Sequence, residues 1–158
     1  MTTITLNAVD VFRSVIELAI IGYLIYLSIY DIRYHKIRNN AVLLFIPVVM
    51  MKCTLRVCMG TLFEYVPMLF GAAAGFTILL VAAMITHGGI GGGDIKLSAV
   101  LGLAASLTGT LVSLVVASLA AAGYGMFQVY VQKKPKVSLA FVPFLLTGYV
   151  TALLTGFC

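Results

Sequence analysis

Long apolar runs alternate with short polar loops along the whole chain. Most of these runs approach the length of about 20 apolar residues that a helix needs to cross a bilayer. The pattern therefore predicts an all-α, polytopic membrane protein with about six transmembrane helices. The expected spans cover approximately residues 14–30, 40–58, 62–86, 94–107, 110–131 and 139–157.

Two expected spans carry residues that bear on helix packing. The second is apolar only as far as Met51, but long basic side chains can extend to an interface, so Lys52 and Arg56 allow the helix to continue. The third contains Gly71 and Gly75 at the GxxxG spacing that lets helices approach closely. We therefore expect this third helix to pack tightly against a neighbour.

The composition agrees with a membrane environment. Of the 158 residues, 62% are hydrophobic and 9% are charged, and the mean hydropathy is +1.13. A soluble domain would carry about 25% charged residues. Because no polar stretch is longer than a loop, we expect residues 1–158 to form a single membrane-embedded domain.

The basic residues indicate the orientation of this domain. Six spans place the loops 31–39, 87–93 and 132–137 on one face, and cytoplasmic loops carry an excess of Lys and Arg. We therefore expect this face to be cytoplasmic and both termini to be non-cytoplasmic. Two of its loops contain Arg33, Lys36, Arg38, Lys133, Lys134 and Lys136, whereas the opposite face has Arg13, Lys52 and Arg56.

The net charge of +5 does not indicate a nucleic-acid-binding protein, because aromatic residues do not alternate with the basic ones. The three cysteines form no CxxC pair, and His35 and His87 lack the spacing of metal ligands. We therefore expect neither metal nor cofactor. Asp10 and the lack of a basic segment before the first apolar run argue against a cleavable signal peptide.

Two of the five acidic residues occupy matching positions in this topology. Asp31 follows the first expected span, and Asp94 follows a glycine-rich turn. A carboxylate at the edge of a hydrocarbon layer is costly, and both aspartates fall on the same predicted face. We therefore expect them to share a site.

Paired carboxylates can hydrolyse a peptide bond without a metal or cofactor. Two such groups in a poorly solvated site do not both ionise easily, so one can retain a proton while the other activates a water molecule. Gly91 and Gly93 would permit unusual backbone angles and a close approach of substrate. The structural alternative is a flexible turn in which Asp94 caps the next helix.

These residues resemble the motifs of the type IV prepilin peptidases, which are membrane aspartic proteases of the GxGD class. Gly91-Gly92-Gly93-Asp94 followed by Lys96 is similar to the family motif GxGDxK. The first catalytic aspartate of the family precedes a basic loop ending in Ile-Pro-Asn, and the matching stretch here runs from Asp31 to Ile37-Arg38-Asn39.

The resemblance implies an aspartic endopeptidase that removes leader peptides from Flp-like prepilins or pseudopilins. Asp31 and Asp94 would be its catalytic residues, with Gly91, Gly92, Gly93 and Lys96 at the active-site loop. The active site would face the cytoplasm from the bacterial inner membrane. The resemblance leaves the oligomeric state open.

The chain departs from the family pattern in three places. Arg38 replaces the usual proline, and residues 140–144 only partly match the family's Pro-Phe-Gly-Pro-Phe. The cysteine-rich, zinc-binding region that larger members use for N-methylation has no counterpart here. We therefore expect peptidase activity without methyltransferase activity.

Two other residues have alternative interpretations. Glu17, within the first span, could be a proton-coupling site of a small transporter or membrane adaptor, but its position near the outer end favours an interfacial residue. Lys96 could stabilise a carboxylate or contact substrate. It could equally anchor a short helix at the interface.

Overall fold

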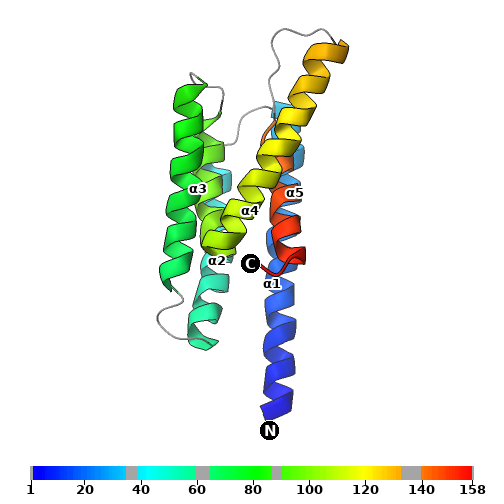
Figure 1. The fold of residues 1–158 in the computed structure, drawn as a ribbon. Helices are drawn as coiled ribbons and strands as arrows, with labels where there is room; N and C mark the ends of the chain where they lie inside the picture. The colour runs from blue at the N-terminus through cyan, green and yellow to red at the C-terminus, as the bar shows by residue number, and fades with distance from the viewer. Residues whose placement is uncertain (1, 35–38, 60–64, 87–89, 133–139, 158) are drawn as a thin grey trace.

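The computed structural model describes residues 2–34, 39–59, 65–86, 90–132 and 140–157. Within these ranges the regular structure is helical and contains no strand, which confirms the all-α prediction. Figure 1 shows the helices as a bundle of upright rods. They are α1 (Thr2–Tyr34), α2 (Asn39–Met59), α3 (Tyr65–Ile85), α4 (Gly92–Gln132) and α5 (Val142–Leu154).

Four of the described helices, α1 to α4, are long and apolar enough to cross a membrane. The fifth, α5, is apolar but has only 13 residues. The structure thus supports a multi-pass membrane protein, whereas six separate spans and the side of the termini stay predictions. Large apolar side chains cover much of the outer surface, as expected where lipid is the solvent.

The fourth and fifth expected spans both lie within α4, which is kinked at Ser106 (φ 60°, ψ −177°). The first arm runs beside α3, and the second turns back along α5 (Figure 1). A guanidinium nitrogen of Arg56 donates a hydrogen bond to Ser106 Oγ at 2.7 Å. The side chain of Arg56 thus reaches the kink of α4, and α2 continues past it to Met59, as expected.

The expected close packing of the third span is confirmed, and its neighbour is the first arm of α4. A Cβ at Gly75 would lie 2.6 Å from the backbone oxygen of Ser98, and one at Gly71 would overlap the backbone of Gly102. Ser98 Oγ also donates a hydrogen bond to Gly75 O at 3.1 Å. The absence of side chains at these glycines thus brings α3 and α4 into backbone contact.

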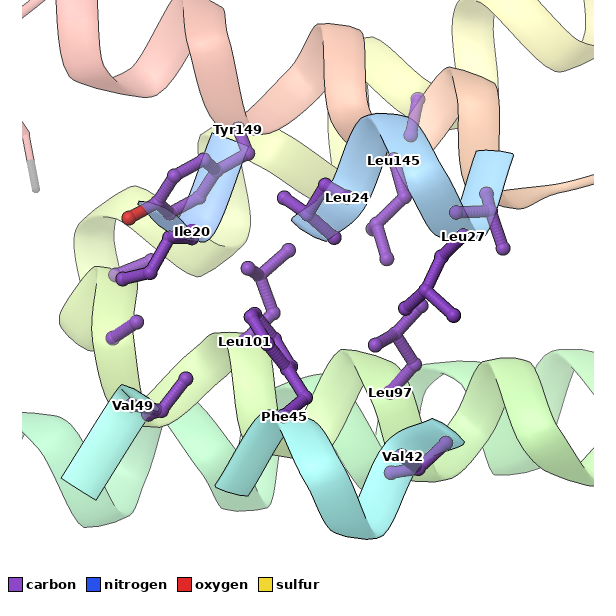
Figure 2. Packing of buried hydrophobic residues seen from close by; sticks show 14 of the residues in the cluster. Ile20, Leu24, Leu27, Val42, Phe45, Val49, Leu97, Leu101, Leu145 and Tyr149 are labelled. Carbon is purple, nitrogen blue, oxygen red and sulfur yellow. The ribbon is translucent and has the colours of Figure 1, made fainter. Parts of the chain in front are cut away.

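The buried core lies mainly between α1, α2, α4 and α5, whose apolar side chains point toward one another in Figure 2. On each helix these residues recur at intervals of three or four, so they share one face. This packing fixes the relative positions of the helix ends, including the end of α1 and the start of α4. The residues labelled in the figure are Ile20, Leu24 and Leu27 of α1, Val42, Phe45 and Val49 of α2, Leu97 and Leu101 of α4, and Leu145 and Tyr149 of α5.

Candidate active site

Asp31 and Asp94 lie at the same end of the bundle. The end of α1 and the start of α4 lie at the same end in Figure 1. Asp31 is 4% exposed and Asp94 is 9% exposed, and the two are close enough for their charges to interact. Asp31 was expected just beyond its helix, but α1 continues to Tyr34, so the carboxylate projects from the last helical turn.

The carboxylate of Asp31 contacts the start of α5. The backbone N–H of Val142 donates a hydrogen bond to Asp31 Oδ2 at 3.2 Å, and this contact is buried. The first N–H groups of a helix have no partner within the helix, and Phe141 makes no side-chain cap here. Asp31 supplies the acceptor instead. Sequence reasoning missed this group, although Pro143 is a typical signal of a helix start.

Asp94 has different surroundings. Its backbone N–H donates to Gly91 O at 3.0 Å, so the residue lies in the first turn of α4. Its Oδ1 atom is buried and has no hydrogen-bond partner among the described residues. Buried polar atoms normally have one. This oxygen is therefore available to a donor that enters the site.

The glycines before Asp94 matter for the room that their missing side chains leave, not for unusual backbone angles. Helix α4 begins at Gly92, so Asp94 is not its N-cap. Among the described glycines, positive φ occurs at Gly156, so the backbone-angle prediction for Gly91 and Gly93 is wrong. A Cβ at Gly91 would lie 3.1 Å from Asp94 Oδ2, whereas one at Gly92 would meet no atom within 4 Å.

Lys96 links two helix starts beside the aspartates. Its Nζ donates a hydrogen bond to Asn39 Oδ1 at 3.1 Å, and this contact is exposed. Asn39 begins α2, so the bond joins α2 to α4. This link was not among the two roles expected for Lys96. The sequence offered Asn39 only as the last residue of a loop motif.

Several residues considered above fall outside the described ranges. Within those ranges, no group of three or more His, Cys, Asp or Glu side chains could hold a metal ion. The residues outside are His35, His87, Lys36, Arg38, Lys133, Lys134 and Lys136.

Glu17 and Lys52 lie inside the bundle and form an ion pair. Tyr149 also contacts both side chains. The expectation that Lys52 extends outward is therefore wrong, whereas the depth of Glu17 in the membrane stays a prediction. Charged groups within membrane spans face the interior and pair because lipid cannot solvate them. Lys52 thus compensates the charge of Glu17.

Comparison with known proteins identifies the family of this chain. The type IV leader peptidase family matches residues 18–126, which include both. The chain belongs to this family. The prepilin leader peptidase/N-methyltransferase of Bacillus subtilis (strain 168) is 35% identical over 137 residues, which cover 86% of this chain and 54% of that relative. The chain thus spans about half the length of this leader peptidase relative. No solved structure matches it significantly.

Proposed function

We propose that this chain is an aspartic endopeptidase that cleaves the leader peptide from Flp-like type IV prepilins or pseudopilins, with Asp31 and Asp94 as the catalytic pair. The observation that carries the proposal is that two buried aspartates from α1 and α4 interact at one end of the bundle. Membership of the type IV leader peptidase family supports the same reaction.

The pair would act by activating water. One carboxylate removes a proton from a bound water molecule while the water oxygen bonds to the carbonyl carbon of the scissile peptide. The other carboxyl group, which is protonated, donates its proton to the leaving nitrogen as the C–N bond breaks. The two groups titrate as a unit. Neither a metal ion nor a covalent intermediate takes part.

The surroundings of the two carboxylates differ in a way that suits this reaction. The Val142 N–H orients Asp31, whereas Asp94 Oδ1 has no partner in the described part of the chain. Asp94 therefore offers the freer oxygen to water or substrate. Lys96 and Asn39 border the site, where they would contact the backbone of the leader.

The active site would face the cytoplasm of a bacterial inner membrane. Arg33 in the last turn of α1, the basic loop residues of the sequence and the positive-inside rule support this orientation. The apolar helix of the precursor would lie in the bilayer beside the enzyme. That residues 1–158 form one domain without methyltransferase activity stays a prediction.

The test is co-expression with a candidate prepilin, with processing read as a mobility shift. Asp31→Asn and Asp94→Asn should each abolish the shift while the protein still accumulates in the membrane. Asp10→Asn is the matched control, because Asp10 is exposed on α1 and about six turns from Asp31. Full processing by Asp94→Asn would refute the proposed mechanism.

A further inference from the structure

Glu17, Lys52 and Tyr149 form a closed polar cluster inside the bundle. The ammonium of Lys52 pairs with Glu17 Oε1 and donates to the Tyr149 hydroxyl at 3.2 Å, which donates to Glu17 Oε2 at 2.8 Å. Tyr149 and Lys52 are 0% and 5% exposed. Each member contacts the other two, and each comes from a different helix.

The cluster is too far from the aspartates to touch a substrate there. Along α1, Glu17 lies about four turns, or roughly 21 Å, from Asp31. Lys52 lies roughly 20 Å along α2 from Asn39, and Tyr149 lies roughly 10 Å along α5 from Val142. The three helices that the cluster joins thus carry Asp31, Asn39 and the Val142 amide at their other ends.

Stability alone does not account for an ion pair at this position. Replacing a buried ion pair by apolar residues of similar volume is often neutral or stabilising, and the surrounding core is already apolar. What an ion pair adds is a geometric requirement. Apolar side chains tolerate sliding and rotation, whereas the three polar groups meet in one arrangement of α1, α2 and α5.

We propose that Glu17, Lys52 and Tyr149 are positioning residues, which set the rotation and axial register of α1, α2 and α5 and so hold Asp31 against Asp94. A shift of one residue in register turns a helix by about 100°. Such a rotation of α1 would carry Asp31 away from both the Val142 amide and Asp94. Figure 2 shows Tyr149 beside Ile20, one turn from Glu17, where α1 and α5 pack together. The activity readout of this inference rests on the function proposed above.

The first experiment replaces the ion pair by an apolar pair. The double variant Glu17→Met/Lys52→Met should keep the helix content and thermal midpoint of the wild type, but its kcat for prepilin cleavage should fall about ten- to a hundredfold, with KM changed less than about twofold. The charge swap Glu17→Lys/Lys52→Glu should restore most of kcat. The matched control is Leu18→Met/Met51→Leu, which alters the lipid-facing neighbours of the two residues.

A second measurement reports the geometry of the aspartate pair without using activity. In a background with Cys53, Cys58 and Cys158 replaced by Ser, Asp31→Cys and Asp94→Cys are introduced together and crosslinked by an oxidant. The yield should be high with the cluster intact, low with the apolar pair and restored by the charge swap. If the wild type cleaves no prepilin, the proposed function fails while this measurement still tests the positioning role.

The outcomes separate positioning from a purely structural role. A folded apolar-pair variant with wild-type kcat and crosslinking would overturn the proposal. If that variant does not fold, Tyr149→Phe tests the positioning role, because this change removes one hydroxyl group and keeps the aromatic ring in the core. It should lower kcat and crosslinking severalfold, and unchanged values of both would overturn the proposal.

Discussion

The backbone N–H of Val142, at the start of α5, donates a hydrogen bond to Asp31 Oδ2 at the end of α1. The bond connects a candidate catalytic group to a helix that lies outside the segment matched by the leader peptidase family. A hydrogen bond to a charged group contributes about 1.5 to 3 kcal/mol. It also restricts the rotation of the Asp31 carboxylate.

Replacing Val142 by its α-hydroxy acid should therefore slow prepilin cleavage. This change removes the N–H and keeps the side chain, so kcat should fall about tenfold or more, in line with the loss of one charged hydrogen bond. Val142→Ala keeps the N–H and is the control. Single-turnover cleavage in detergent would measure both, and an ester variant as fast as wild type would show that the amide does not orient Asp31.

Gly91→Ala should impair the site more than Gly92→Ala. A Cβ at Gly91 would lie 3.1 Å from Asp94 Oδ2 and push that carboxylate aside, whereas a Cβ at Gly92 meets open space. The carboxylate would have to move by a few tenths of an ångström, which should lower kcat severalfold, because a displacement of about 1 Å can cost about a hundredfold in rate. Comparing kcat for the two variants checks this, and equal losses would exclude a steric role for Gly91.

Side chains added between α3 and α4 should destabilise the protein. At Gly102 the Cβ of alanine would overlap the backbone of Gly71, and overpacking of this kind costs about 1 to 3 kcal/mol. Gly22→Ala is the control, because its Cβ meets no atom within 4 Å and Ala favours a helix by about 1 kcal/mol over Gly. In micelles, the midpoint of thermal unfolding should be lower for Gly102→Ala than for the wild type, and equal or higher for Gly22→Ala.

Replacing Lys52 alone should lower the stability of the protein more than replacing both Glu17 and Lys52 by apolar residues. Lys52→Met leaves the Glu17 carboxylate buried without its cation, which should lower the free energy of unfolding by about 3 to 5 kcal/mol. The apolar double variant should be about as stable as the wild type. Chemical denaturation in mixed micelles would measure both, and a single variant as stable as the double would contradict the pairing.

Features that depend on neighbouring residues could be predicted from the amino-acid sequence alone. The apolar runs predicted helices and a membrane environment, and the spacing of Gly71 and Gly75 predicted a close helix contact, because both are properties of a single helix. The placement of Asp31 and Asp94 on one face followed from counting the helices between them. Family motifs then indicated the chemistry.

The tertiary structure decided which distant groups meet. The partners of Asp31, Lys96 and Glu17 are Val142, Asn39 and the Lys52–Tyr149 pair, and each lies on another helix. Such contacts depend on how helices rotate and slide against one another, which hydrophobic periodicity leaves open when nearly every face is apolar. For this reason the sequence could not show that Glu17 and Lys52 pair with each other. Only the packed bundle turns them toward each other.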